Sequence, residues 1–157
     1  DYDYEKFAKV VDTNYLGVLR IANPVIAQME RQGGGHFSVI ASVAGYFGLP
    51  RSAAYSSTKA GLINLLETMR TELAPRHIKV RMIAPGFVKS ELTDKNDFPM
   101  PFLMETDEAA KRIVDGLTQS DRFEIAFPKR MVWLMKTVRW LPYPVFFWLT
   151  SKMLPKD

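Results

Sequence analysis

Apolar residues recur at spacings of three and four along the first part of the chain, from Tyr4 to Met29. This spacing predicts a long helix that is buried along a broad apolar stripe. Pro24 lies inside the predicted helix and can bend it, and the glycines at 33–35 predict its end. The stripe consists of Phe7, Val10, Val11, Tyr15, Leu16, Val18, Leu19, Ala22, Val25, Ile26 and Met29.

Helical and strand-like patterns alternate after this helix. Short apolar or β-branched runs predict strands, and between them lie longer segments with helical spacing. The predicted segments are residues 36–41 (strand), 53–74 (helix), 78–84 (strand), 106–118 (helix) and 123–127 (strand). This alternation is typical of a parallel, doubly wound α/β sheet.

Three local features refine this prediction. The run Phe37, Val39 and Ile40 predicts that the first strand is buried on both faces. Thr106 is the expected N-cap of the third helix, because acidic residues follow it in the first turn. Residues 87–104 are expected to form a mobile loop. Its apolar side chains fit two roles equally well, which are covering an apolar ligand and packing on the protein's own core.

Composition limits the function classes. The 157 residues are 47% hydrophobic and 24% charged, which fits one globular domain over residues 1–157. With no cysteine and two histidines, the sequence excludes disulfides, thiolate metal centres and a His-rich metal site, so no metal site is expected. The absence of cysteine also suits a reducing compartment such as the cytoplasm.

The net charge of +4 is concentrated in a basic, aromatic tail, residues 129–157. This tail holds six Lys and Arg against one acid, or +5, which leaves −1 for the rest of the chain and argues against nucleic-acid binding. Its longest uncharged run, Trp140 to Ser151, is 12 residues with two prolines, too short to span a bilayer. The tail is therefore expected to pack over a substrate cleft or subunit interface, or to lie at a membrane surface.

Four residues are candidates for chemistry. Tyr55 and Lys59 lie one helical turn apart, and an ammonium beside a phenol favours the phenolate, so Tyr55 can exchange a proton nearer neutral pH. Ser42 follows the first strand, at the edge where parallel sheets bind ligands. Asn14 is unfavourable within an apolar helix and needs a partner. Each of these residues, taken alone, also fits a structural role.

Because of these residues and their order along the sequence, the chain resembles the short-chain dehydrogenase/reductase family. The resemblance covers residues 1 to about 127 and implies a Rossmann-like, doubly wound parallel sheet. A Tyr-x-x-x-Lys box alone is a weak signal, whereas four ordered motifs are specific. The motifs are Asn14 in Asp-Thr-Asn-Tyr-Leu-Gly, Ser42 in Ala-Ser-Val-Ala-Gly, Tyr55-Ser-Ser-Thr-Lys59, and Pro85-Gly86-Phe-Val-Lys-Ser.

The resemblance implies a role for each residue. Tyr55 would be the general acid in ketone reduction and the base in alcohol oxidation, while Ser42 would position the reacting oxygen. Lys59 would assist Tyr55 and bind the nicotinamide ribose, and Asn14 would hold a water that relays protons to Lys59. The cofactor would be NAD or NADP, and its implied binding residues are Tyr55, Lys59, Pro85, Gly86, Val88 and Ser90. Ser90 stands where the family often has Thr.

One departure from the family is large. The family's glycine-rich phosphate loop, its first strand and the residue that selects NAD or NADP have no counterpart in this sequence. Gly33–Gly35 precedes a strand, whereas a dinucleotide loop follows one. We therefore expect an incomplete sheet that lacks the N-terminal dinucleotide-binding half, and a chain that neither folds well nor turns over by itself.

Two functions remain open. The first is an NAD(P)-dependent oxidoreductase that acts on a secondary alcohol or ketone of a moderately apolar small molecule, in a homodimer or homotetramer as the resemblance implies. The alternative is a non-catalytic scaffold or membrane-surface binding protein that keeps the sheet. The first is favoured because a scaffold does not need a lysine beside a tyrosine at the end of a strand. The expected location is cytoplasmic, or peripheral to a membrane through the tail.

Overall fold

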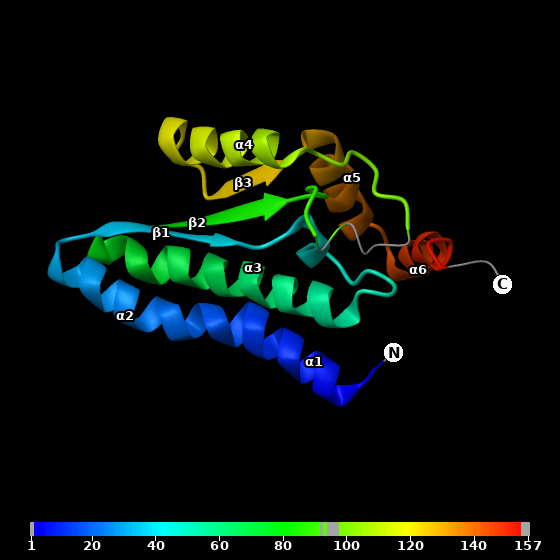
Figure 1. The fold of residues 1–157 in the computed structure, drawn as a ribbon, viewed down its shortest axis with the longest axis horizontal. Coiled ribbons are helices and arrows are strands. Elements are labelled where there is room, and N and C mark those ends of the chain that lie inside the picture. Colours follow the sequence, from blue (N-terminus) through cyan, green and yellow to red (C-terminus); the bar gives the residue numbers. More distant parts are fainter. Residues whose placement is uncertain (1, 92, 94–97, 155–157) are drawn as a thin grey trace.

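Three parallel strands form the centre of the computed structural model, which describes residues 2–91, 93 and 98–154 (Figure 1). They are β1 (Gly35–Ile40), β2 (Ile78–Pro85) and β3 (Glu124–Phe127), in the spatial order β1-β2-β3. Helix α3 (Ala53–Leu73) connects β1 to β2, and α4 (Thr106–Gln119) lies between β2 and β3. The predicted α/β, Rossmann-like parallel sheet is confirmed, with boundaries within a few residues of those expected.

The predicted N-terminal helix consists of three consecutive helical segments. These are α1 (Tyr4–Val11), a π-helical turn, η1 (Asp12–Leu16), and α2 (Gly17–Arg31). Helices α2 and α3 cover one face of the sheet, whereas α4 lies on the other face, over β3 (Figure 1). Helices therefore lie on both faces of the sheet, as in other doubly wound folds.

The main core lies between the sheet and α3. Leu62 and Leu66 of α3 and Val80 of β2 are fully buried, and Phe37 and Val39 of β1 pack in the same cluster. The helical spacing of the two leucines places them on the face that meets the strands. This packing fixes α3 along β2, and so fixes the position of its first turns near the carboxyl ends of the strands.

Two local predictions were wrong. Ile40 is 55% exposed, so β1 is not buried on both faces, because the described part of the chain places α4 over β3 and not over β1. Thr106 is not the N-cap of α4, because that position is taken by Glu105. The Thr106 hydroxyl instead donates a hydrogen bond to the carbonyl oxygen of Lys89, at 2.8 Å.

The tail forms two helices that the sequence did not predict, α5 (Lys129–Arg139) and α6 (Tyr143–Ser151). Their inner residues join Val43 and Phe47, which follow β1, in a second apolar cluster. The T-shaped ring pair of Phe47 and Phe146, with centroids 5.4 Å apart, belongs to this contact. None of the described helices has the length and apolarity needed to cross a bilayer.

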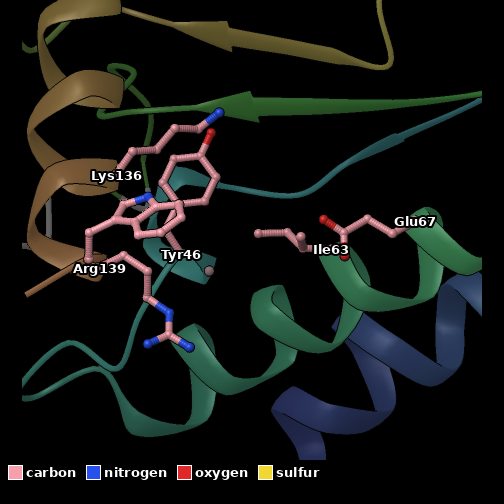
Figure 2. A pocket seen from close by; sticks show the side chains of 7 residues that line it. Tyr46, Ile63, Glu67, Lys136 and Arg139 are labelled. Atoms are coloured by element: carbon pink, nitrogen blue, oxygen red, sulfur yellow. The ribbon is translucent and has the colours of Figure 1, made fainter.

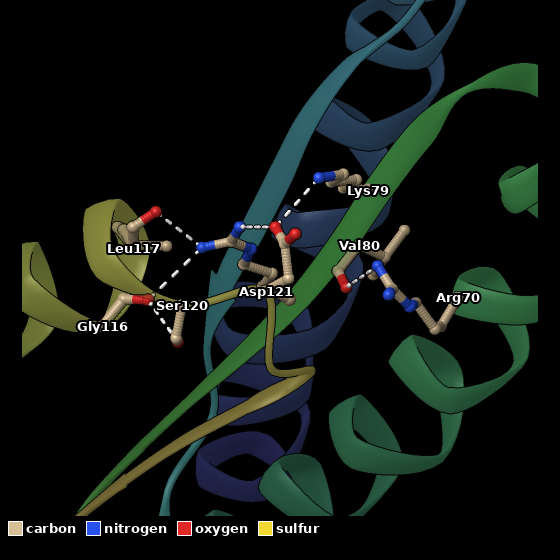
Figure 3. Close-up of polar contacts among 8 residues, drawn as sticks. Arg70, Lys79, Val80, Gly116, Leu117, Ser120 and Asp121 are labelled. Atoms are coloured by element: carbon tan, nitrogen blue, oxygen red, sulfur yellow. Dashed lines mark hydrogen bonds and ion pairs between the residues drawn. The ribbon is translucent and has the colours of Figure 1, made fainter.

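A buried arginine joins β2 to the end of α4 (Figure 3). Arg81 is 2% exposed and donates to the carbonyl oxygen of Leu117 at 2.6 Å and to the Asp121 carboxylate at 3.0 Å. Lys79 also donates to Asp121, and this hydrogen bond is the main reason that the pKa of Asp121 is lowered. The guanidinium thus lies at the negative end of the α4 dipole. This interaction offsets part of the free-energy cost of burying its charge.

Candidate active site

Ser42 joins the carboxyl ends of β1 and β2. It is 7% exposed, and its hydroxyl accepts a hydrogen bond from the Ala44 backbone N–H at 3.1 Å, which caps the 3₁₀ turn η2 (Val43–Gly45). The same hydroxyl donates to the carbonyl oxygen of Pro85 at 3.3 Å. Ser42 is therefore held at the sheet edge where ligands bind in α/β folds.

Tyr55 and Lys59 occupy the first two turns of α3, and Lys59 reaches the same sheet edge. Its ammonium donates to the carbonyl oxygen of Ile40, the last residue of β1, at 2.9 Å. The Lys59 nitrogen also lies 5.6 Å from the centre of the Tyr55 ring. Burial lowers the pKa of Lys59. The structure thus brings a partly desolvated cation beside the phenol.

Gly45 allows η2 to lie directly against α3. A Cβ atom at Gly45 would come within 2.6 Å of the carbonyl carbon of Lys59, closer than real Cβ contacts. Any larger residue would push the segment that begins at Ser42 away from the helix that carries Tyr55 and Lys59. Local sequence gives no sign of this role, beyond the position of Gly45 at the end of the Ala-Ser-Val-Ala-Gly motif.

Asn14 lies in the π-helical turn η1 and contacts α3. Its side-chain amide donates to the hydroxyl of Thr58 at 3.3 Å, and that hydroxyl in turn donates to the carbonyl oxygen of Tyr55 at 2.8 Å. A π-helical turn within a longer helix is frequent at functional sites. Asn14 therefore has the partner that a half-buried amide needs, and this partner lies between Tyr55 and Lys59 in the sequence of α3.

The predicted cofactor-binding residues from the last position of β2 onward are divided between two places. Pro85 accepts the hydrogen bond from Ser42, and the Gly86 N–H donates to the carbonyl oxygen of Phe127 at 2.7 Å. Val88 instead pairs with Met104 in an isolated β-bridge. Ser90 is exposed in a turn whose hydrogen bonds go to Thr93. Of these four residues, Pro85 is the one in direct hydrogen-bond contact with another candidate residue.

A polar network lies on the α3 side of the sheet, next to a cavity of about 210 Å³ (Figure 2). The Tyr46 hydroxyl donates to the Glu124 carboxylate at 2.7 Å, and Lys136 forms an ion pair with the other carboxylate oxygen. The network connects the segment after Ser42 to β3 and α5. None of Ser42, Tyr55 and Lys59 lines this cavity, so it is distinct from the candidate active site.

Tyr46 is expected to make folding stability sensitive to alkaline pH. Burial and the hydrogen bond to Glu124 raise the pKa of Tyr46 above its usual value. Its contribution to stability is therefore complete below the unfolded-state value of about 10 and is lost as the pH rises above it. We expect Tyr46→Phe to lower the free energy of unfolding by about 1–3 kcal/mol at neutral pH and to reduce its decline above pH ~10.

Urea unfolding at a series of pH values measures both effects. Tyr2→Phe is the matched control, because Tyr2 is 85% exposed. An alkaline decline that is the same in Tyr46→Phe as in the unsubstituted protein would contradict this prediction.

Comparison with known proteins gives the family of this chain. Residues 1–99 match the family described as short chain dehydrogenase. The chain belongs to this family. It is 39% identical over 143 residues to an uncharacterized oxidoreductase of Myxococcus xanthus, which covers 91% of this chain and 56% of the relative. It is also 41% identical over 90 residues to a 3-oxoacyl-acyl-carrier-protein reductase of Staphylococcus epidermidis, which covers 57% of this chain and 37% of that protein.

Solved structures of other members of this family agree with the fold of the chain. A short chain dehydrogenase from Burkholderia cenocepacia in complex with NADP superposes with a TM-score of 0.81, at 20% identity, over 98% of this chain and 62% of that one. A short-chain dehydrogenase from Streptomyces avermitilis superposes with a TM-score of 0.75, at 22% identity, over 96% of this chain and 62% of that one. The chain spans about half the length of the curated relatives that it matches over most of its own length.

Proposed function

We propose that this chain supplies the catalytic part of an NAD(P)-dependent oxidoreductase that interconverts a secondary alcohol and a ketone. The observation that carries the proposal is the contact of Lys59 with both Tyr55 and the end of β1. Ser42 lies at the end of the same strand, which supports a shared reaction site. A purely structural protein has little use for a partly buried ammonium beside a phenol at this edge, because taking a charge out of water is costly.

Each side chain has a defined task in this mechanism. In ketone reduction, the Tyr55 hydroxyl gives its proton to the carbonyl oxygen. The Ser42 hydroxyl turns its one O–H from the Pro85 carbonyl to that oxygen and donates a hydrogen bond to it. The nearby Lys59 ammonium stabilises the phenolate that remains on Tyr55. In alcohol oxidation, the same groups act in the reverse direction, with Tyr55 as the base. Asn14 supports proton exchange by holding a water near Lys59.

The chain's own residues fit a nicotinamide dinucleotide at this edge. Lys59 uses one ammonium proton on the Ile40 carbonyl and retains two donors for ribose hydroxyls. Pro85 and Gly86 turn the chain beside Ser42, where the nicotinamide end would lie, with Val88 and Ser90 further along the same segment. NAD or NADP supplies or accepts the hydride when bound. The NADP in the Burkholderia cenocepacia structure supports this class of cofactor.

The substrate that we propose is a moderately apolar small molecule. Phe98, Phe102 and Leu103 are each between 39% and 45% exposed in the loop before α4. The ring of Phe98 lies 6.0 Å from that of Phe87, which directly follows Pro85-Gly86. These side chains are therefore available to an apolar ligand near the proposed site. The name of the Staphylococcus epidermidis relative supports a 3-oxoacyl thioester as a first test substrate.

Ser42→Ala tests the proposal directly. In the intact protein that contains this chain, we expect kcat/KM for NADPH-dependent reduction of a 3-oxoacyl thioester to fall about 10²–10³-fold, because one donor to the reacting oxygen is lost. Ser57→Ala is the matched control, since Ser57 is exposed on α3 and its hydroxyl bonds only to its own helix. Unchanged kinetics in Ser42→Ala, with the fold intact by circular dichroism, would remove Ser42 from the mechanism.

We also propose a homodimer or homotetramer. Leu16 of η1 and Leu19 of α2 support it, because they lie three residues apart on one face of the continuous helix and are 39% and 36% exposed. Apolar side chains grouped on such a helix are typical of subunit contacts. The molar mass in solution, measured by light scattering, tests the assembly independently of the catalytic proposal.

A further inference from the structure

Helix α6 is apolar on all its sides and yet lies at the surface. Helices of this composition are normally buried in a core or in lipid. Only its inner side is covered here, by the cluster that contains Val43 and Phe47. On its outer side, Tyr143 is 64% exposed, and Phe147 and Trp148 are each 60% exposed. Such large exposed side chains, next to one another, indicate a surface with a partner.

Helix α5 continues this exposed surface. Its inner residues are buried in the same cluster as those of α6, whereas Trp133 is 71% and Leu134 is 54% exposed on the opposite side. Trp140, directly after α5, is 88% exposed. We call these outward side chains the aromatic surface: Trp133, Leu134, Trp140, Tyr143, Phe147 and Trp148. It contains all three tryptophans of the chain.

The aromatic surface lies at one end of the molecule. Figure 1 shows α6 at the C-terminal extreme of the fold, away from the helix pair α2 and α3. Because α5 and α6 direct their inner residues at one common cluster, their outer sides point away from the rest of the described protein. No described element covers these side chains, so a partner can reach them.

The charge around the aromatic surface is positive. No acidic residue occurs between positions 128 and 154. Of the acids nearby in the fold, Glu124 is paired with Lys136, and Glu67 lines the cavity on the α3 side together with Arg139. Lys129, Arg130 and Arg139 are exposed and form no ion pair with another described residue. The Lys152 nitrogen lies 3.5 Å from the centre of the Trp148 ring, which places a cation at the edge of the apolar side chains. A complementary partner therefore combines apolar material with negative charge.

A second copy of this chain does not supply that combination. In a two-fold symmetric dimer, the aromatic surface of one subunit packs against the aromatic surface of the other. The basic residues of the two subunits would then lie close together and repel one another. An anionic bilayer does supply it, because tryptophan and tyrosine favour the headgroup region and lysine and arginine are attracted to anionic lipids. The long basic side chains can reach the headgroups while the rings enter the acyl boundary.

We propose that the aromatic surface docks the protein onto an anionic lipid membrane, with α6 lying in the interface and no segment crossing the bilayer. This proposal does not depend on the proposed catalytic function. It does place the catalytic edge next to the membrane, because α5 and α6 pack on Val43, directly after Ser42, and on Phe87, directly after Pro85-Gly86.

Vesicle flotation of the intact protein tests the proposal. The probes are vesicles of phosphatidylcholine alone and of phosphatidylcholine with phosphatidylglycerol. We expect the protein to float with the anionic vesicles, to bind the neutral ones weakly and to dissociate as salt is raised. We also expect tryptophan emission to shift to the blue on adding anionic vesicles, since every tryptophan belongs to the aromatic surface.

Two variants separate the apolar and the charged contributions. Phe147→Ser with Trp148→Ser is expected to lower partitioning into anionic vesicles about tenfold or more, because two apolar side chains no longer enter the interface. Lys129→Glu with Arg130→Glu is expected to abolish the preference for anionic over neutral vesicles. Both of these basic residues are exposed, so this second pair does not endanger the fold. Ile21→Ser is the matched control, because Ile21 is equally exposed but lies on α2.

The outcomes are distinguishable. Loss of vesicle binding in both double variants, with Ile21→Ser unchanged, supports the proposal. Absence of binding to anionic vesicles, or equal binding by the charge-reversed variant, overturns it. So does a result in which Phe147→Ser with Trp148→Ser halves the molar mass in solution while the unsubstituted protein ignores vesicles, because the surface is then a subunit interface.

Discussion

Replacing Tyr55 with Phe is expected to lower kcat/KM about 10²–10⁴-fold while leaving NADPH binding nearly unchanged. The substitution removes only the hydroxyl that exchanges the proton. The ring remains beside the Lys59 ammonium, whose nitrogen lies 5.6 Å from its centre, so the position of Lys59 is kept. Steady-state oxidation of NADPH with a 3-oxoacyl thioester, together with a fluorescence titration of NADPH, measures both quantities in the intact protein.

Tyr4→Phe is the matched control for this variant. Tyr4 is 77% exposed at the start of α1, so both kinetic constants should be unchanged. Full activity in Tyr55→Phe would exclude Tyr55 as the proton donor. A large loss of NADPH binding would instead show that the hydroxyl serves the cofactor more than the reacting oxygen.

Lys59→Met is expected to weaken cofactor binding as well as to slow the reaction, whereas Tyr55→Phe is expected only to slow the reaction. It removes the ammonium that stabilises the phenolate and that donates to ribose hydroxyls, so kcat/KM should fall about 10²–10⁴-fold and the Kd for NADPH should rise. Folding should change little. Burial already disfavours this ammonium, as its lowered pKa shows, and this offsets the loss of its hydrogen bond to Ile40.

Thermal unfolding and NADPH titration together show whether Lys59→Met impairs proton transfer, cofactor binding or folding stability. Lys9→Met, at an exposed position of α1, is the control for the loss of one charge. A fall in kcat/KM with an unchanged Kd for NADPH would limit Lys59 to the proton-transfer role. A large fall in thermal stability would show that its contact with the end of β1 is mainly structural.

Tyr55→Phe and Lys59→Met therefore test two side chains of one site, at the carboxyl ends of the strands. Ser42 and Lys59 each use a hydrogen bond to the end of a strand, Ser42 to β2 and Lys59 to β1. Such bonds fix the positions of the Ser42 oxygen and the Lys59 nitrogen before any ligand arrives, which is a preorganisation that favours catalysis. Gly45 adds to it, because only a glycine lets the segment after Ser42 rest on the backbone of Lys59.

The order of the elements and the candidate site followed from local patterns in the sequence. Residues with strand and helix periodicity alternate along the chain, and the boundaries of β2 and α3 fall where Pro75 and the β-branched run predict them. Tyr55 and Lys59 could be paired because four residues make about one helical turn. The position of Ser42 followed from the rule that ligands meet the carboxyl ends of parallel strands.

Features that depend on contacts between distant segments were decided by the tertiary structure. Arg81 is a charged residue within a strand, yet it is buried because the end of α4, 36 residues further on, offers it a carbonyl oxygen. Tyr46 finds its carboxylate partner 78 residues away. The exposure of Ile40 was also not predictable, because it depends on which strand α4 covers.

In the tail, the difference between what the sequence determines and what tertiary packing determines is clearest. Its composition established a basic, aromatic segment too short to cross a bilayer, because charge and hydropathy are properties of the sequence itself. Composition did not establish which of its aromatic side chains would be covered. That depended on whether the segment after Ser42 offered an apolar surface, and packing on Val43 and Phe47 buried one side of α5 and α6 and left the other side free.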